Sequence, residues 1–330
     1  MTELAAICPD PGLQTSLEQG LAQVEDSLHD AIRSDYPFVT AASGHLVDAG
    51  GKRFRPLLTL LAAHLGPAPA HPHVIKAATV VELTHLATLY HDDVMDEAAL
   101  RRGAPSANAR WDNTVAILTG DFLFSRASDI LADLGPEAVR IQARTFERLC
   151  TGQIRETVGP EDGIDPVKHH LQVLADKTGS LIATSARFGA MMAGANLDTI
   201  DAITRYGEAI GIAFQIADDI VDITSEATQS GKMPGTDLRE GIPTLAALYA
   251  LASDDPQDAQ LHDLLLRPLD DDAEHAQALA LLREHQALAD ARSEAQRWAA
   301  DARKALKGVR PSPATDTLNA LCDYVVDRTS

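Results

Sequence analysis

The sequence has few aromatic residues and no long apolar run. Phe, Trp and Tyr together make up 4% of its 330 residues, whereas Ala and Leu are abundant. Strands favour aromatic and β-branched residues, so this composition favours helices over a β-sandwich or barrel. No apolar segment approaches the roughly 18 residues that a membrane-spanning helix needs. We therefore expect a helical protein without an integral membrane segment.

Cysteine is also scarce. Cys8, Cys150 and Cys322 are odd in number, lie far apart and form no Cys-x-x-Cys pair. This pattern favours reduced thiols in a cytoplasmic protein over a disulfide framework or a zinc site. The first twenty residues contain acids and no basic stretch before an apolar run, so we expect no secretory signal. The predicted location is cytoplasmic.

Basic residues are in the minority. The chain has 28 Lys and Arg against 48 Asp and Glu, which gives a formal net charge of -20. A nucleic-acid partner needs a basic face, so we expect none. An acidic chain can still bind an anionic ligand where its few basic residues are clustered.

Apolar residues recur mostly at intervals of three and four, which is the period of an amphipathic helix. The acidic stretch Ser253–Asp272 contains two Pro and predicts a loop with one short helix at most. No internal repeat and no long linker divides the chain, so we expect one all-α domain over residues 1–330, a helical bundle. The pattern predicts helices at residues 14–33, 35–49, 54–65, 72–97, 105–132, 134–158, 165–194, 196–224, 242–253, 274–307 and 315–327.

A first aspartate motif lies at the end of an apolar helical segment, residues 80–97. Asp92 and Asp96 are four residues apart, so both carboxylates leave the same helix face. Like charges at this spacing repel, and a divalent cation relieves the repulsion. Carboxylate oxygens suit Mg²⁺, which binds through one or two carboxylates plus substrate phosphates. A solvated acidic turn is the alternative.

A second aspartate motif repeats this spacing within residues 214–222. Asp218 and Asp222 are four apart, with Asp219 between them and apolar neighbours on both sides. Two such clusters inside apolar helices favour a metal site over two solvated turns. If they face each other across a helical bundle, they can hold two or three metal ions around one polyphosphate.

Basic residues are clustered near these motifs despite the acidic composition. Gly50 and Gly51 let the backbone turn sharply before one cluster, and Pro56 then opens a helix. Arg forks match phosphate oxygens, whereas Lys supplies a point charge. A structural role is equally consistent with Lys177 and Lys232 taken singly. The basic candidates are Lys52, Arg53, Arg55, Arg101, Arg102, Lys177 and Lys232.

Six segments in order between residues 45 and 250 resemble the trans-isoprenyl diphosphate synthases, or polyprenyl synthetases. This resemblance implies an all-α fold around a central active-site cavity, usually in a homodimer. It also implies condensation of an allylic diphosphate with isopentenyl diphosphate, with two or three Mg²⁺ ions. The segments read GGKRFRP, HDDVMD followed by RRG, GDFLFSRA, DKTGSL, FQIADDIVD and GKMPGTDLREG.

The resemblance also implies roles for single residues. The metal ligands that it implies are Asp92, Asp93, Asp96, Asp218, Asp219 and Asp222. The implied contacts to isopentenyl diphosphate are Lys52, Arg55, His85 and Arg102. The implied contacts to the allylic diphosphate are Arg101, Lys177 and Lys232. The residues implied to be catalytic are Lys177, Thr178 and Gln215, of which Thr178 and Gln215 are implied to line the carbocation.

One segment departs from the family pattern. The family often reads Gly-Lys-x-Thr-Leu-Pro after the second motif, whereas this chain has Ile242 in place of the Lys and Pro243 at a shifted position. One helper contact to the allylic diphosphate is therefore expected to be absent.

Product length is expected to depend on the helix before Asp92. Thr88 and Ala87 lie about one turn before it, and Thr84 lies on the next turn. Family members that make short products often place an aromatic ring four or five residues before the motif. The small side chains here predict a product of about thirty carbons or more, with a short-chain, geranylgeranyl-type synthase as the alternative.

Three other functions compete with this prediction. A terpene cyclase of the same general fold needs no isopentenyl site, so Lys52, Arg55, His85 and Arg102 speak against it. A non-catalytic subunit of a heteromeric synthase usually lacks aspartates, and both motifs are intact here. A helical protein that binds hard metals without catalysis leaves the basic clusters unexplained.

Overall fold

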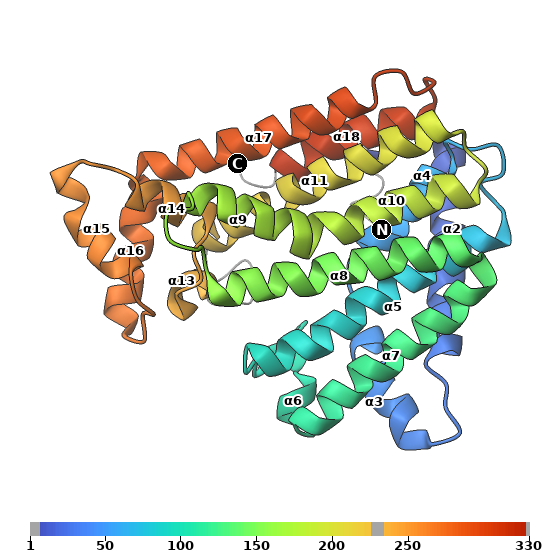
Figure 1. The fold of residues 1–330 in the computed structure, drawn as a ribbon, viewed down its shortest axis with the longest axis horizontal. Coiled ribbons are helices and arrows are strands. Elements are labelled where there is room, and N and C mark those ends of the chain that lie inside the picture. The colour runs from blue at the N-terminus through green and yellow to red at the C-terminus, as the bar shows by residue number, and fades with distance from the viewer. Residues whose placement is uncertain (1–6, 226–233, 328–330) are drawn as a thin grey trace. The chain divides into compact units, whose positions relative to one another are not determined.

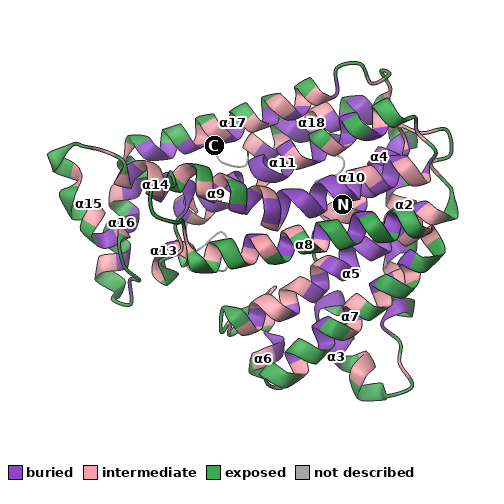
Figure 2. Ribbon diagram, in the orientation of Figure 1, coloured by how far each residue is buried: buried purple, intermediate pink, exposed green. Residues whose placement is uncertain are grey.

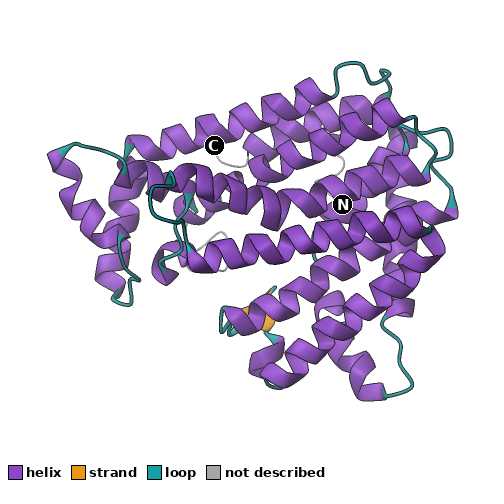
Figure 3. Ribbon diagram, in the orientation of Figure 1, coloured by secondary structure: helices purple, strands orange, loops and turns teal. Residues whose placement is uncertain are grey.

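The computed structural model describes residues 7–225 and 234–327, and it is helical almost throughout (Figures 1 and 3). This confirms the all-α prediction. The chain separates into two compact units. The first unit comprises Met1–Phe146, Leu181–Gly207 and Gly308–Leu318. The second comprises Glu147–Ser180, Glu208–Lys307 and Asn319–Ser330.

The first unit contains the first aspartate motif. Its long helix α5 packs along α7 and also contacts α4 and α2. A two-stranded antiparallel hairpin, β1–β2, follows α5. The elements of this unit are α2 (Pro11–Ala31), α3 (Pro37–Asp48), α4 (Phe54–Ala63), α5 (Pro72–Met95), β1 (Leu100–Arg101), β2 (Ala104–Pro105), α6 (Ala107–Arg110) and α7 (Asn113–Leu134).

The second unit contains the second aspartate motif. Four helices contribute residues to both units, namely α8 (Pro136–Val158), α10 (Ser180–Met192), α11 (Leu197–Thr224) and α18 (Pro313–Asp327). The elements that belong to the second unit alone are α9 (Pro166–Leu174), the π-turn η1 (Ala175–Gly179), α13 (Thr236–Glu240), α14 (Leu245–Leu251), the 3₁₀ turn η2 (Pro256–Asp258), α15 (Ala259–Leu265), α16 (Asp272–Glu284) and α17 (Gln286–Ala305). The single domain over residues 1–330 stays a prediction.

Helix α5 is the buried axis of the first unit (Figure 2). Its buried residues lie on every side of the helix, as expected of a helix that is enclosed by others. The buried Tyr90 hydroxyl donates to the Ala42 carbonyl at 2.6 Å and accepts from the Leu46 amide at 3.3 Å. Gly120 of α7 lies so close to His91 that a side chain there would displace the ring. These contacts determine where α5 presents its C-terminal turn.

Helix α11 has one apolar face in the core of the second unit. Ile216, Ile220 and Ile223 pack there with buried residues of α14, α16 and α17. These positions follow the helical period, so Asp218 and Asp222 leave the helix on the opposite face. The apolar pattern of the sequence thus orients the second motif.

Two predicted helices are interrupted in the structure. Residues 105–132 were expected to form one helix, but Pro105 lies in β2 and α7 begins only after Asp112. The Asp112 carboxylate accepts from the Val115 amide at 2.8 Å, which caps the new helix. Residues 274–307 break at His285, whose backbone is extended and whose ring accepts from the Ala287 amide at 3.0 Å. In both places, a capping side chain starts a new helix where the apolar period predicted a continuous one.

The acidic stretch Ser253–Asp272 contains the short helix α15, which confirms that prediction, together with the turn η2. Predicted helix 165–194 is interrupted by the π-turn η1, so it forms α9 and α10 in succession. Among the described helices, none combines the length and the apolar character that crossing a bilayer requires.

Candidate active site

The hairpin after the first motif folds two arginines back toward α5. Arg102 and Gly103 both have positive φ, as a two-residue type I′ turn requires. The paired residues are Leu100 with Pro105 and Arg101 with Ala104. The sequence did not predict this hairpin, because strands of two residues leave no alternating pattern. It brings Arg101 to the end of α5 and Arg102 to the chain around Leu46 and Gly50.

Asp93, the middle residue of the first motif, is fully buried. Its Oδ1 accepts from Arg101 Nε at 2.6 Å, and its Oδ2 lies 3.5 Å from the Ala107 amide at the start of α6. Arg101 also lies 3.7 Å from the Asp96 carboxylate. Asp96 ends the helix, and its amide donates to the Asp92 carbonyl at 2.8 Å. Asp93 therefore holds the hairpin, and its predicted role as a metal ligand stays a prediction.

Arg53 of the glycine-rich turn faces inward. Its guanidinium donates to both carboxylate oxygens of Glu25 and to Glu82 Oε1, the latter at 3.0 Å. Burial alone lowers the pKa of this guanidinium, but hydrogen bonds to Glu25 outweigh that effect and the pKa is raised. Sequence reasoning grouped Arg53 with Lys52 and Arg55, but this pairing gives it a structural role in the turn.

Arg102 lies across the same turn. Its Nη1 donates to the Leu46 carbonyl at 2.9 Å and to the Gly50 carbonyl. A Cβ at Gly51 would stand 2.9 Å from the guanidinium carbon of Arg102, so only glycine allows this close approach. The hairpin arginine and the glycine-rich turn therefore meet, although about fifty residues separate them in the chain.

His85 lies where these arginines converge. Its side chain is partly exposed in the first unit. Burial lowers the pKa of His85 well below its ordinary value, and repulsion from Arg55 and Arg102 lowers it further. The imidazole is therefore neutral at physiological pH. The structure brings together three of the four predicted isopentenyl contacts, and Lys52 lies on the exposed rim of the same turn.

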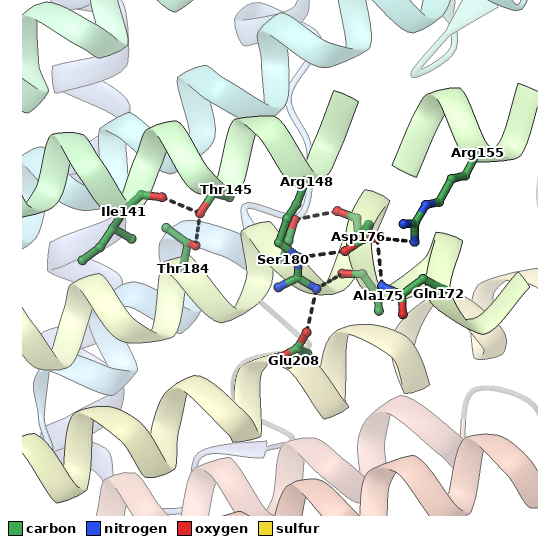
Figure 4. A network of polar contacts seen from close by, with 10 residues as sticks. All are labelled: Ile141, Thr145, Arg148, Arg155, Gln172, Ala175, Asp176, Ser180, Thr184 and Glu208. Atoms are coloured by element: carbon green, nitrogen blue, oxygen red, sulfur yellow. Dashed lines mark hydrogen bonds and ion pairs between the residues drawn. The ribbon is translucent and has the colours of Figure 1, made fainter. Parts of the chain in front are cut away.

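The predicted chain-length positions differ in burial. Thr84 and Ala87 have no exposed surface, whereas Thr88 keeps part of its surface exposed. The Thr84 hydroxyl accepts from Gln142 Nε2 of α8 at 2.7 Å. One turn further along α8, the Thr145 hydroxyl lies 2.6 Å from that of Thr184 (Figure 4). Two polar pairs therefore join α8 to α5 and to α10 within this unit.

The second motif also has a buried middle aspartate. Asp219 Oδ1 accepts from Gln215 Nε2 at 2.9 Å. Burial raises the pKa of Asp219 well above its ordinary value, and the nearby carboxylate of Asp237 raises it further. Asp218 and Asp222 lie on the less buried face of α11. The role of Asp219 as a metal ligand stays a prediction.

The predicted carbocation residues are hydrogen-bonded to each other. The Thr178 hydroxyl donates to Gln215 Oε1 at 3.1 Å, and Gln215 in turn donates to Asp219. Lys177, the preceding residue, forms an ion pair with Glu156 of α8. Thr178 and Gln215 are therefore connected to the second motif through Asp219, whereas Lys177 contacts α8. Lys232 lies outside the described residues.

Sequence reasoning missed Asp237, which lies in α13. Its amide is 3.4 Å from Asp222 Oδ2. Burial raises the pKa of Asp237 to about 7, and repulsion from Asp222 contributes to the rise. The segment GTDLREG contains this residue, but its letters do not reveal that the carboxyl is buried beside the second motif.

The donor atoms of both motifs suit a hard cation. Carboxylate oxygens at positions four apart match Mg²⁺, which usually completes its shell with water and substrate phosphate. Over residues 7–225 and 234–327, no three His, Cys, Asp or Glu side chains converge to hold an ion by themselves. The oxygen donors of the two motifs fit a divalent cation that completes its shell with other ligands.

The chain is similar to known proteins over nearly its whole length. The chain is 49% identical over 319 residues to nonaprenyl diphosphate synthase of Mycobacterium tuberculosis, covering 97% of this chain and 95% of that protein. The structure of geranylgeranyl pyrophosphate synthase from Corynebacterium glutamicum, complexed with calcium and isoprenyl diphosphate, matches with a TM-score of 0.88 and 47% identity, covering 98% and 99% of the two chains. Decaprenyl diphosphate synthase from Rhodobacter capsulatus matches with a TM-score of 0.87 and 34% identity, covering 96% and 98%.

The family model named polyprenyl synthetase matches residues 36–282, which is most of the chain. This range contains every predicted site residue. The chain belongs to the polyprenyl synthetase family.

Proposed function

We propose that this protein is a prenyltransferase that condenses an allylic diphosphate with isopentenyl diphosphate to give a linear trans-polyprenyl diphosphate. The observation that carries the proposal is the cluster of Arg55, His85 and Arg102 in the unit of the first aspartate motif. Such a cluster offers fixed positive charge and a neutral imidazole to a diphosphate. A terpene cyclase has no second diphosphate to bind there.

In the first step, the carbon–oxygen bond of the allylic diphosphate breaks, and the bonding electron pair leaves with the diphosphate. Asp92, Asp96 and Asp218 would hold two or three Mg²⁺ ions, which, when bound, neutralise charge on the leaving group. Arg101, Lys177 and Lys232 would bind its remaining oxygens. The Thr178 hydroxyl and the Gln215 amide oxygen would face the allylic cation with their lone pairs.

In the second step, the alkene of isopentenyl diphosphate donates its electron pair to the cation, and a carbon–carbon bond forms. Lys52, Arg55, His85 and Arg102 would hold the diphosphate of this acceptor. The new cation then loses a proton from the carbon next to its charged centre. The departed diphosphate is the base that accepts this proton. No side-chain base is required, which agrees with the neutral, arginine-flanked His85 as a hydrogen-bonding group.

We propose a product of about thirty carbons or more. The similar proteins include synthases named for long products and several named for geranylgeranyl pyrophosphate. The small side chains of Ala87, Thr88 and Thr84 favour the long product, because no aromatic ring stands four or five residues before Asp92 on α5. A short-chain, geranylgeranyl-type product is the second candidate.

An assay of the purified chain tests the reaction. The protein is mixed with Mg²⁺, labelled isopentenyl diphosphate and allylic primers of increasing length, and products are separated by size. We expect linear products whose formation requires both substrates. Products made from the allylic substrate alone would instead identify a cyclase, and no turnover by the chain alone would favour a subunit of a heteromeric enzyme.

Substitution of the chain-length positions tests product size. Ala87→Phe and Thr88→Phe should each shorten the product, because a ring then stands about one turn before Asp92. Ala87 is completely buried, so its substitution should also cost about 1–3 kcal/mol of stability through overpacking. Thr88→Phe should leave the midpoint of thermal unfolding nearly unchanged. Unaltered product length in a folded Thr88→Phe variant would contradict the assignment.

We also propose a homodimer in the cytoplasm. Ile117 and Leu118 of α7 are exposed apolar residues that a second copy of the chain would cover. Light scattering after gel filtration measures the mass in solution, and Leu118→Lys should shift it toward the monomer. Cell fractionation tests the location.

A further inference from the structure

The residues Lys177 and Thr178 lie in a π-turn, η1, between α9 and α10. The Ser180 amide donates to the Ala175 carbonyl, five residues back, in place of the usual four. Such a turn costs stability relative to a continuous α-helix and is frequent at functional sites. The contacts that hold this turn therefore influence the directions of the Lys177 and Thr178 side chains.

Asp176 is the buried anchor of the turn. Its Oδ1 accepts from Arg148 Nε at 2.8 Å. Its Oδ2 accepts from Gln172 Nε2 at 2.8 Å and from Arg155 Nη1 at 3.2 Å. Figure 4 shows the Asp176 carboxylate between these donors. Two arginines neutralise its charge, so the carboxylate does not act as a repulsive group toward an anionic ligand.

Arg148 joins three parts of the second unit. Besides Asp176, it donates Nη2 to the Ala175 carbonyl at 3.2 Å and to Glu208 Oε1 of α11 at 2.6 Å (Figure 4). The Ser180 hydroxyl donates to the Asp176 carbonyl at 2.6 Å. The carbonyls of Ala175 and Asp176, the first two of the turn, therefore each accept a hydrogen bond from a side chain. These bonds compensate for the wider hydrogen-bond spacing of the π-turn.

The turn is also closely packed on both sides. A Cβ at Gly152 of α8 would lie 2.7 Å from the Lys177 amide nitrogen, and a Cβ at Gly179 would lie 3.3 Å from the Glu208 carbonyl oxygen. Arg148, Gly152 and Glu156 follow each other at intervals of four, so one face of α8 meets the turn. The backbone at Lys177 is therefore held by contact as well as by hydrogen bonds.

We propose that Asp176 and Arg148 are positioning residues that set the direction in which Lys177 leaves the π-turn toward the allylic diphosphate. Asp176 immediately precedes Lys177, so fixing its carboxylate against α8 fixes the rotation of the next side chain. The inference rests on the proposed function, in which Lys177 binds that diphosphate.

The test compares Asp176→Asn and Arg148→Gln with a control pair elsewhere in the second unit. Asp323→Asn removes the ion pair between Arg303 of α17 and Asp323 of α18, so it reports the effect of losing an ion pair alone. For each full-length variant, kcat, both KM values and the thermal unfolding midpoint are measured. We expect the KM for the allylic diphosphate to rise about ten- to a hundredfold in the two site variants, with the isopentenyl KM and the control unchanged.

A double-mutant cycle with Lys177→Ala separates positioning from general damage. In the Lys177→Ala background, Asp176→Asn should no longer raise the allylic KM, because the side chain that it orients is gone. An equal rise in both backgrounds, or an equal rise in the isopentenyl KM, overturns the proposal. If Asp176→Asn does not fold, Ser180→Ala, which removes only one hydroxyl bond from the turn, takes its place in the cycle.

Activity of the wild-type chain separates failure of the proposed function from failure of the positioning role. If it does not condense the two substrates, the proposed function fails. If it does, and the site variants keep the wild-type allylic KM, only the positioning role fails.

Discussion

The two aspartate motifs share the pattern Asp-Asp-x-x-Asp but have different surroundings. In the first, the buried Asp93 forms an ion pair with Arg101, and more arginines surround His85 nearby. In the second, the buried Asp219 is held by a neutral amide, that of Gln215, and lies near other carboxylates. A buried charge is costly unless it is paired. The charge of Asp93 is therefore compensated by an arginine, whereas Asp219 accepts from a neutral amide and burial raises its pKa.

This difference assigns separate tasks to the two regions. We expect the first region, where arginines surround His85, to attract a diphosphate without metal. In the second region Asp237 lies beside Asp222, and we expect an anion to bind there more tightly once cations are present. The same four-residue spacing thus supports two electrostatic environments.

Removal of a ligand from either motif should have the largest effect. Asp92→Ala and Asp218→Ala should each lower kcat about a thousandfold, because charge on the leaving group is no longer neutralised. Initial rates with saturating Mg²⁺ measure this loss. Asp201→Ala changes an exposed aspartate of the same helix as Asp218 and should keep normal turnover. Undiminished activity in both site variants would refute the metal-binding role.

Removal of metal should affect the two substrates unequally. With a chelator present, isopentenyl diphosphate should still bind, whereas an unreactive allylic diphosphate analogue should bind only when Mg²⁺ is restored. Arg102→Gln should weaken binding of isopentenyl diphosphate about ten- to a hundredfold, since a charged hydrogen bond contributes about 1.5–3 kcal/mol. Calorimetry measures both affinities. If binding of the two ligands depended equally on metal, the proposed difference between the two regions would be refuted.

Neutralising the middle aspartates should change stability in opposite directions. Asp93→Asn leaves Arg101 without its buried partner and should cost about 1–3 kcal/mol, reduced from the fully buried case because Arg101 is partly exposed. Asp219→Asn keeps an oxygen for Gln215 and removes a carboxyl whose charged form burial disfavours, so stability at neutral pH should stay equal or rise. Denaturant unfolding of the metal-free protein measures both. A comparable loss in the two variants would contradict the different surroundings.

The pH dependence of the metal-free protein should be smaller but diagnostic. The pKa of Asp237 is about 7 in the folded state, above its unfolded value of about 4. The folded state therefore binds more protons between these values, so stability falls as pH rises from about 4 to about 7. We expect a loss of about 2 kcal/mol, because neighbouring carboxyls share the proton. Asp237→Asn should flatten this decline, and an unchanged slope would exclude Asp237 as its source.

Much of the site could be predicted from the chain itself. Asp92 with Asp96 and Asp218 with Asp222 were recognisable because the helical period places residues four apart on one face, beside apolar residues that face a core. The spacing of Arg101 and Arg102 after the first motif was also visible. Their actual contacts were not, since a hairpin of two-residue strands leaves no periodic signal.

Neighbouring residues of one type could not be told apart by sequence. Arg53 and Arg55 belong to the same short segment, yet Arg53 is buried between Glu25 and Glu82. Asp176 carries no signal of its own, and its importance follows from Arg148, which lies 28 residues earlier. Contacts between distant segments decide these roles, and no local pattern encodes them.

The sequence by itself determined the all-α class, the two carboxylate faces and the family, because helical periodicity and motif spacing are local properties of the chain. Only the tertiary structure decided which aspartates are buried, which arginine is paired inside the turn and how the π-turn at Lys177 is held. Burial and charge pairing depend on what other segments bring to a side chain, and this is the physical reason that they appear only in the folded protein.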